Sequence, residues 1–183
     1  MYKPTKPIQH SKKAAKLPVI GPSVLVSVDK RAVDIPAKID TGAESSAIWA
    51  SNVHIDEQGI LKFTLFGPGS PFYTGEVYRR SDYKVFTVRS AMGEEQIRYR
   101  THLSLSINGH HVKVLFSLAD RSKNSFPILI GRSTIKGRFL VDVSLPDVKY
   151  ERKPKKSLDL KEFRTNPHRF HQKYVAKTNQ KGE

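Results

Sequence analysis

The residues from 97 to 107 constrain the fold of this chain more than any other segment, because their side chains alternate between two kinds. A period of two is that of a β-strand, whose successive side chains point to opposite faces of a sheet. The pattern therefore predicts one long strand with a buried face and a polar face. The buried face would consist of Ile97, Tyr99, Thr101, Leu103, Leu105 and Ile107, and the polar face of Arg98, Arg100, His102, Ser104 and Ser106.

Turn signals on both sides of this strand predict two β-hairpins. Before it, a β-like run at 83–89 is joined to it by Ser-Ala-Met-Gly-Glu-Glu, which places a hairpin tip near Met92–Gly93. After it, Asn108-Gly109 is the dipeptide that most strongly favours a two-residue hairpin turn. The segment 110–119 would then return as the next strand.

The remaining patterns predict a mainly β domain. Two runs on either side of Lys30-Arg31 read as a further hairpin, and Gly and Pro mark a loop at 67–76. An apolar run at 126–131 predicts a short strand that is buried on both faces. Other strands are predicted at 24–29, 33–40, 46–53, 60–66 and 138–143, and one helical turn, ended by Gly137, at 132–137.

The net charge of +15 is carried mainly by the two ends of the chain. Residues 1–16 hold five Lys and no acid, and residues 149–183 hold eleven Lys or Arg against four acids. Residues 17–148 are nearly balanced, with sixteen basic residues against thirteen acidic ones. We therefore predict a basic disordered arm at 1–16, a folded domain at 17–148, and a basic, extended or weakly helical tail at 149–183.

The composition excludes several classes of protein. The chain has no cysteine, which excludes disulfides, thiolate metal sites and a cysteine nucleophile, and agrees with a cytoplasmic location. It contains no run of about 18 apolar residues, so no membrane partner is expected. The charged start lacks the apolar core of a secretory signal.

The tripeptide Asp40-Thr41-Gly42 is the first candidate for chemistry. It follows an apolar run and occurs once in the chain. Taken alone, it is typical of a turn at the end of a strand. Its interpretation depends on a second element about ninety residues later, where Pro-Ile-Leu-Ile-Gly is followed by Arg132 and a helix-like turn.

These two elements, with the hairpin between them, resemble the retropepsin-type aspartic peptidases. In that family the first element carries the catalytic Asp, and the second packs beneath the active-site loop and leads into a short helix. The hairpin corresponds to the flap that closes over substrate, a little under forty residues before Gly131. The resemblance covers about residues 20–145 and implies a single-lobe acid-protease β-barrel with one short helix after the Gly-Arg element.

A closer resemblance is to bacterial and archaeal proteins catalogued as ATP-dependent zinc proteases. It rests on AKIDTGAESSAIWA, VRSAMGEEQIRYR and LADRSKNSFPILIGRSTIKGRFLVDVS. The zinc and ATP of that label have no counterpart here, because the sequence has neither His-Glu-x-x-His nor a phosphate-binding Gly-x-x-x-x-Gly-Lys-Ser/Thr loop. His110 and His111 are adjacent on a predicted strand and would point to opposite faces. We therefore expect no metal and no cofactor.

The resemblance implies that Asp40, Thr41 and Gly42 form the catalytic loop. Asp40 would activate water, Thr41 would brace the loops, and Gly42 would let the substrate backbone approach. Because one chain supplies one such Asp, it also implies a homodimer in which two copies of Asp40 meet on a two-fold axis. The ends of this chain are basic and poor in β-formers, so we expect the dimer to be held elsewhere or to be weak.

Further residues receive roles from the same resemblance. Glu44 would pair with Arg132, and an Arg fork held by a carboxylate would lock the active-site loop to the body of the domain. Gly131 and Arg132 would thus support the loop. The implied substrate contacts are Ala43, Glu44, Ser90, Ala91, Met92 and Gly93.

The sequence leaves three interpretations of function open. The first is an aspartic endopeptidase that hydrolyses peptide or protein substrates. The second is a catalytically idle retropepsin-like dimer that binds peptide or scaffolds a complex. The third is nucleic-acid binding through the basic tails. The positive charge is also compatible with acidic or glutamate-rich substrates, since the family resembles proteins linked to ligases that add glutamate to protein tails.

Overall fold

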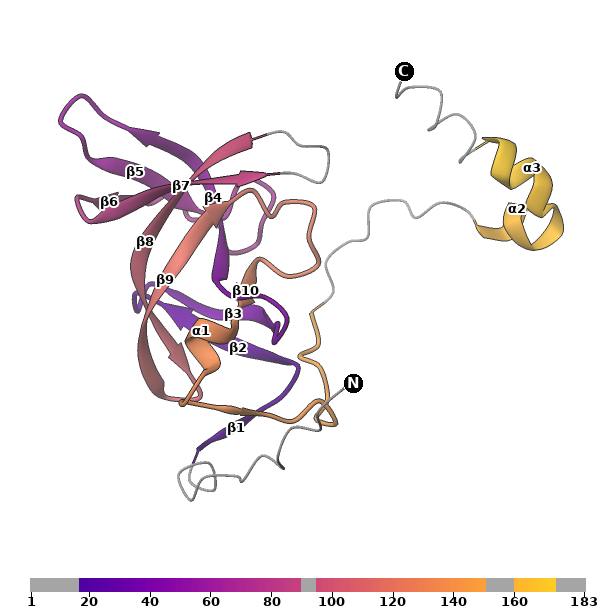
Figure 1. Ribbon diagram of the computed structural model, residues 1–183, viewed down its shortest axis with the longest axis horizontal. Helices are drawn as coiled ribbons and strands as arrows, with labels where there is room; N and C mark the ends of the chain where they lie inside the picture. The colour runs from indigo at the N-terminus through magenta and orange to yellow at the C-terminus, as the bar shows by residue number, and fades with distance from the viewer. Residues whose placement is uncertain (1–16, 90–94, 151–159, 174–183) are drawn as a thin grey trace, which may run out of the picture. The chain divides into compact units, whose positions relative to one another are not determined.

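The structure is a computed structural model that describes residues 17–89, 95–150 and 160–173 (Figure 1). The chain divides into two compact units, residues 1–150 and residues 151–183. The predicted arm at 1–16 lies outside the described residues. The described elements of the first unit are β1 Val19–Ile20, β2 Ser23–Val28, β3 Ala32–Ile39, β4 Ser46–Ile55, β5 Leu61–Leu65, β6 Val77–Arg80, β7 Tyr83–Arg89, β8 Glu95–Ile107, β9 His110–Ala119, β10 Ile128–Ile130, α1 Arg132–Ile135 and β11 Leu140–Val141.

Six strands of the first unit close into a β-barrel. Hydrogen bonding runs in the order β10, β3, β2, β8, β9 and β4, and a pairing of β10 with β4 closes the ring. The predicted hairpins β2–β3, β7–β8 and β8–β9 are antiparallel pairs, whereas β10 pairs with β3, and β4 with β9, in parallel. The predicted mainly β barrel with a short helix after the Gly-Arg element is confirmed.

The longer barrel strands continue past the barrel and carry additional strands. The second half of β4 pairs with β5, which pairs in turn with β6, and the first half of β8 pairs with β7. Figure 1 shows β5, β6 and β7 gathered at one end of the barrel, away from β1. The described arms of the β7–β8 hairpin therefore extend past the barrel.

The predicted buried face of β8 is correct for only part of the strand. Ile97 is 63% exposed, because residues 95–99 pair with β7 alone among the described strands and lie outside the barrel. Tyr99 is half-buried. The burial predicted from the alternation is found at Thr101, Leu103, Leu105 and Ile107.

The predicted strand at 138–143 is wrong in extent, and the strands β1 and β6 were not predicted. Only Leu140–Val141 forms a strand, β11, which pairs in parallel with β1. Backbone N–H groups of Leu140 and Asp142 donate to carbonyls of Pro18 (3.0 Å) and Ile20 (2.9 Å), so the pairing ends where β1 ends. The other unpredicted strand, β6, begins directly after the predicted loop at 67–76.

The hydrophobic core fills the barrel and extends beyond it to Leu61 and Phe63 of β5 and Ile20 of β1. Asn108 and Gly109 form the tight turn between β8 and β9, with φ values of 48° and 79°, as their sequence predicts. The turn keeps β8 and β9 in a register that directs their apolar side chains inward. The fully buried large side chains are Phe63, Phe66, Phe116, Ile20, Ile35, Ile48, Leu61, Leu103, Leu105, Ile107, Ile128 and Ile130.

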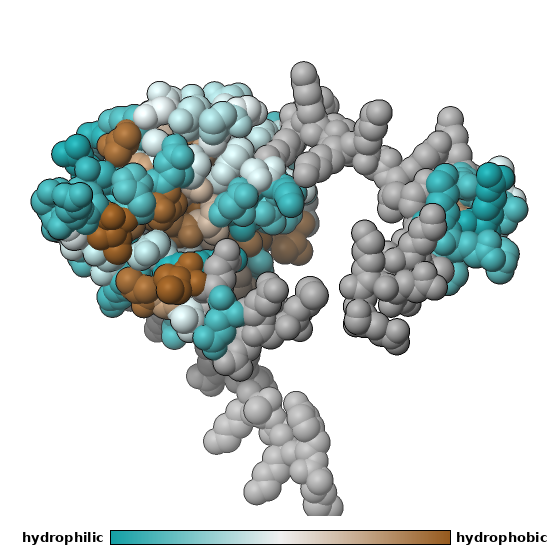
Figure 2. Space-filling view, turned by 90° about the horizontal axis from the view of Figure 1, so that it is seen from above, coloured by the Kyte–Doolittle hydropathy of each residue, from teal (hydrophilic) through white to brown (hydrophobic). Residues whose placement is uncertain are grey.

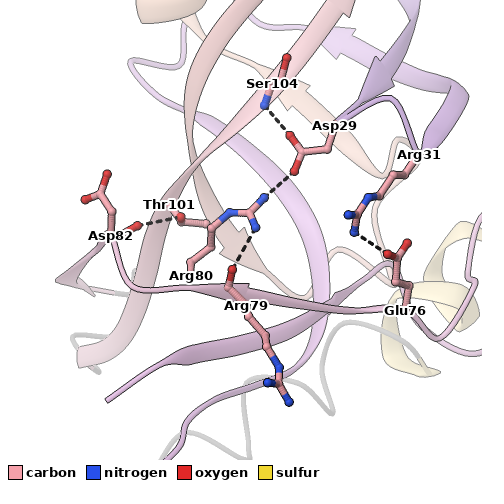
Figure 3. Close-up of polar contacts among 8 residues, drawn as sticks. All are labelled: Asp29, Arg31, Glu76, Arg79, Arg80, Asp82, Thr101 and Ser104. Atoms are coloured by element: carbon pink, nitrogen blue, oxygen red, sulfur yellow. Dashed lines mark hydrogen bonds and ion pairs between the residues drawn. The ribbon is translucent and has the colours of Figure 1, made fainter. Parts of the chain in front are cut away.

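Asp29 ties the β2–β3 turn to two other strands (Figure 3). Its Oδ1 accepts from the backbone N–H of Ser104 on β8 (2.7 Å), and its Oδ2 forms an ion pair with Arg80 of β6. A residue with φ of 47° presents the carboxylate there, a conformation that Asp tolerates better than most residues. Arg31 pairs with Glu76 beside it. These contacts fix the end of the barrel against the strands that continue past it.

The second unit is described from residue 160 to residue 173. It contains two short helices, α2 Leu160–Thr165 and α3 Pro167–His171. Among the described residues of the whole chain, no helix is long and apolar enough to cross a membrane.

Candidate active site

Asp40 lies where β3 ends and the loop to β4 begins. Its backbone N–H donates to the carbonyl of Ile130 on β10 (2.9 Å), which fixes the point where the loop leaves the barrel. Its Oδ1 accepts hydrogen bonds from the N–H groups of Gly42 (2.9 Å) and Ala43 (3.1 Å). The side chain is half-buried. The loop therefore holds this carboxylate in a defined orientation at the surface of the barrel.

The two elements that sequence analysis selected meet at this loop. The N–H of Arg132 donates to the carbonyl of Ala43 (2.8 Å), next to the loop residues that bind Asp40. A Cβ on Gly131 would lie 2.6 Å from backbone atoms of Ser45, which is closer than two non-bonded atoms can approach. Packing therefore requires glycine at this position.

A buried serine links the same elements and was not selected from the sequence. The hydroxyl of Ser46, at the start of β4, accepts a hydrogen bond from the N–H of Gly131 (3.0 Å). It also bonds the hydroxyl of Thr134 in α1 (2.8 Å). Both side chains are buried, so the bonds are shielded from water. The only signal in the sequence was that Ser46 and Thr134 are hydroxyl residues in largely apolar runs, and sequence alone does not show that they contact each other.

Glu44 and Arg132 form the predicted ion pair. Nη2 of Arg132 donates to Oε2 of Glu44 (2.7 Å), and Nη1 donates to the carbonyl of Gly42 (3.3 Å). The hydrogen bond and charge of Arg132 lower the pKa of the Glu44 carboxyl below its usual value. The side chains are 76% and 52% exposed, respectively. The arginine therefore holds the loop from outside, as Ser46 does from inside.

A surface cavity of about 430 Å³ lies beside the loop. It brings the loop residue Thr41, which is exposed, next to the side chains of α1. A molecule that contacts Thr41 from this side therefore also meets the helix and its basic residues. The cavity is lined by Thr41, Glu44, Arg132, Ser133, Ile135 and Lys136.

Arg100 connects the β7–β8 hairpin to the Asp40 loop. Its Nε donates to the hydroxyl of Ser117 on β9 (3.2 Å), and its Nη2 reaches that of Ser45 at 3.5 Å. Its guanidinium lies over the ring of Phe86 on β7, 3.7 Å from the centroid. One side chain thus contacts β7, β9 and the residue that precedes β4.

Arg121 lies within electrostatic reach of Asp40, and Arg98 lies within reach of Arg121. Burial lowers the pKa of the Arg121 guanidinium, the charge of Arg98 lowers it further, and the carboxylate of Asp40 opposes both. Arg121 also donates to the carbonyl of Phe126 (3.2 Å). Arg98 belongs to the polar strand face predicted from the sequence, where it had no assigned role, and Arg121 was not a predicted site residue. At least one cation, that of Arg121, therefore acts on the Asp40 carboxylate.

The structure does not describe every predicted site residue. Ser90, Ala91, Met92 and Gly93 lie outside the described residues, so only the arms of the hairpin can be placed. Within the described ranges, no group of three or more His, Asp or Glu side chains could hold a metal ion. His110, one of the two adjacent histidines, instead packs against Phe139 with ring centroids 5.9 Å apart.

The closed barrel, the Asp-Thr-Gly loop and the Gly-Arg element beneath it define a single-lobe retropepsin-like domain. A family model described as retropepsin-like aspartic endopeptidase RimB matches residues 19–152, which is most of the chain. The chain therefore belongs to the RimB-like family. The resemblance to retropepsins predicted from the sequence is confirmed.

Two relatives differ in how much they cover. A probable alpha-L-glutamate ligase of Shewanella halifaxensis is 26% identical over 113 residues, which is 60% of this chain. The chain spans only 25% of the length of that relative. The crystal structure of Lpg0085, a protein of unknown function from Legionella pneumophila, superposes with a TM-score of 0.53 at 23% identity. It covers 70% of this chain and 95% of its own, and supports the fold alone.

Proposed function

We propose that the protein is an aspartic endopeptidase whose active site is completed by a second copy of the chain. The observation that carries the proposal is the position of Asp40, held by two backbone N–H groups in a loop that Gly131 and Arg132 support. The family description supports this activity. Asp-Thr-Gly occurs once in the sequence, so one chain supplies half of a carboxylate pair.

The chemistry needs two carboxyl groups. Hydrolysis of a peptide bond by water requires a base that deprotonates the water and an acid that protonates the carbonyl oxygen and then the leaving amine. Two carboxyls in close contact cannot both ionise readily, so they share one proton, and each can take one of the roles. A symmetric homodimer with Asp40 of both copies on its axis supplies this pair.

The neighbouring residues have supporting roles in this proposal. Thr41 is exposed at the surface that the second copy would cover and braces the two loops against each other. Gly42 and Ala43 orient Asp40 through their N–H groups and present their backbone to the substrate, while Glu44 contacts substrate at the edge. The β7–β8 hairpin would close over the bound peptide and exclude water.

The substrate we propose is an acidic or glutamate-rich peptide. The charge of Arg121 interacts with that of Asp40, and the charge of Arg98 interacts with that of Arg121. Arg100 and Arg132 contact the segment that follows Asp40. Guanidinium groups bind carboxylates well because their donors match both oxygens. The similarity to a probable glutamate ligase agrees with a glutamate-containing substrate. A chain without cysteine suits the reducing cytoplasm, where we place this activity.

A peptide-library digestion with wild type and Asp40→Asn tests the catalytic role. We expect the variant to lose about 10²–10⁴-fold in kcat/KM, the range for removing a general acid or base. Asp34→Asn is the matched control, because Asp34 is an exposed residue of the same strand and should leave cleavage unchanged. Cleavage by Asp40→Asn at the wild-type rate would show that another group activates water.

Mixing the two proteins tests the shared site. After subunit exchange at equal amounts, random pairing should leave about half of the activity per wild-type chain, because a mixed dimer has one carboxylate. Activity per wild-type chain that does not change on mixing would show that each chain works alone. A dimer in light scattering that cleaves nothing between pH 3 and pH 8 would instead favour the second candidate, an idle peptide-binding scaffold.

Replacing Arg121 with Gln tests the proposed preference for acidic substrates. We expect KM to rise for glutamate-rich peptides and to stay unchanged for neutral ones, because the lost charge contributes to binding only when the substrate is anionic. An equal rise of KM for both kinds of peptide would mean that Arg121 supports the fold and does not select the substrate.

A further inference from the structure

The second unit folds into a defined helical pair within its basic sequence. Asn166 caps α3 by accepting from the N–H of Arg169 (3.0 Å), and Pro167 follows it at the first helical position. The rings of Phe163 and Phe170 pack edge to face across the two helices, with centroids 5.4 Å apart. These are the local devices of a specified structure, and a tail that served only to carry charge would not require them.

The helical pair presents cations around one acidic residue. Glu162 forms ion pairs with Arg169 (3.4 Å) and Lys173 (2.9 Å), and its own side chain is only 23% exposed. Arg169 stays 75% exposed and Lys173 53% exposed. Arg164 is exposed as well. Glu162 therefore fixes the positions of two cations that remain open to solvent, and Figure 2 shows the surface of this unit as predominantly hydrophilic.

An aromatic ring adjoins one of these cations in the sequence, since Phe163 directly precedes Arg164 in α2. Phe163 is 48% exposed although it packs against Phe170. His168 and His171 are exposed on α3 and add two further planar side chains. Exposed rings interleaved with Arg and Lys are the combination that binds single-stranded nucleic acid, because bases stack on the rings and phosphates meet the cations.

We propose that the helical pair α2–α3 is a docking element for single-stranded nucleic acid. The inference does not depend on the peptidase proposal, since it concerns the second unit alone. A membrane surface fits less well, because helices of six and five residues with two Phe offer little apolar face. An acidic protein would meet the cations but would leave the exposed Phe163 without a planar partner.

Fluorescence anisotropy of a labelled 20-nucleotide single-stranded RNA with the 183-residue chain tests the proposal. We expect binding to weaken as the salt concentration rises from 50 to 200 mM. Because Arg164→Ala removes one phosphate contact, the plot of log affinity against log salt should become less steep, by about 0.7 in slope. Phe163→Leu keeps an apolar contact with Phe170 but removes the stacking ring. It should weaken binding by about 5- to 100-fold.

Asn166→Ala tests whether binding requires the folded helical pair or only its positive charge. It removes the cap of α3 without changing any charge, and we expect it to weaken RNA binding several-fold. Wild-type affinity in both Asn166→Ala and Phe163→Leu would overturn the proposal in favour of non-specific attraction by the tail. Tighter binding to phosphatidylserine vesicles than to RNA, or displacement of RNA by an equal charge of poly-glutamate, would also overturn it, by identifying a lipid or an acidic polymer as the ligand.

Discussion

The buried hydroxyl of Ser46 accepts a hydrogen bond from the backbone N–H of Gly131 at 3.0 Å, 85 residues away in the chain. This bond joins the start of β4 to the end of β10, and the Asp40 loop lies between β3 and β4. The same hydroxyl bonds Thr134 in α1 (2.8 Å). The loop that carries the candidate catalytic residue is therefore positioned by a small polar network inside an apolar barrel.

Removing that hydroxyl should destabilise the domain. Ser46→Ala leaves the N–H of Gly131 and the hydroxyl of Thr134 without this partner in a buried site, which costs about 1–3 kcal/mol in the free energy of unfolding. Urea unfolding of the variant measures the loss. Ser45→Ala is the matched control, because the 3.5 Å contact of Ser45 with Arg100 is weak, and it should cost less than about 1 kcal/mol.

Adding one methyl group at Gly131 should be more damaging. In Gly131→Ala the new Cβ would meet the backbone of Ser45 at 2.6 Å, and backbone cannot rotate away as a side chain could. We expect a loss of about 3 kcal/mol or more in unfolding free energy, at or beyond the usual upper limit for overpacking. Gly137→Asn is the control, because Asn tolerates its φ of 71° and no atom lies within 4 Å of the site of its Cβ. Equal stability of the two variants would contradict the packing argument.

The pairing of Glu44 with Arg132 predicts a measurable titration. The hydrogen bond and charge of the arginine lower the pKa of Glu44 in the folded state below 4.5. A lowered folded-state pKa means that the pair stabilises the protein above about pH 4.5, and that this stabilisation is lost as the pH falls through the lowered value. Carboxyl chemical shifts in a pH titration should show the pKa of Glu44 returning upward in Arg132→Gln. An unchanged pKa in that variant would show that Arg132 is not the cause.

The contrast between what sequence could and could not predict follows from the range of the interactions. The buried positions Leu103 and Leu105 and the turn at Asn108–Gly109 depend on neighbours in the chain, so periodicity and turn chemistry predict them. Arg121 and Ser46 acquire their places only when the barrel closes. The Asp40 loop and Gly131 were found because the resemblance to a family joined two patterns that are local in themselves. Ile97 was predicted to be buried because it continues the alternation of β8. It lies, however, in the part of β8 that extends past the barrel.

Asp29 should stabilise the end of the barrel through two different bonds. Asp29→Ala removes the acceptor of the Ser104 N–H and the partner of Arg80 together, and Ala disfavours the φ of 47° at this position. We expect a loss of about 2–4 kcal/mol in unfolding free energy, from the hydrogen bonds and the backbone strain. Asp29→Asn keeps the acceptor and the tolerance of this conformation, and should lose less than half as much. If both variants unfold alike, the ion pair with Arg80 carries the whole effect.

Arg100 should control the position of the β7–β8 hairpin relative to the Asp40 loop. Arg100→Lys keeps the charge but cannot reproduce the donors to Ser117 and Ser45 or the planar contact with Phe86. The lost bonds and ring contact are worth about 1–3 kcal/mol, so amide hydrogens of β7 should exchange about 5- to 100-fold faster. Lys84→Ala removes an exposed cation from the facing position on β7 and should leave exchange unchanged. If the hairpin closes over substrate, Arg100→Lys should also raise KM for peptides more than it lowers kcat, because the open hairpin binds substrate less well before the chemical step. Exchange at the wild-type rate in Arg100→Lys would show that β7 is held by its backbone pairing with β8 and not by this side chain.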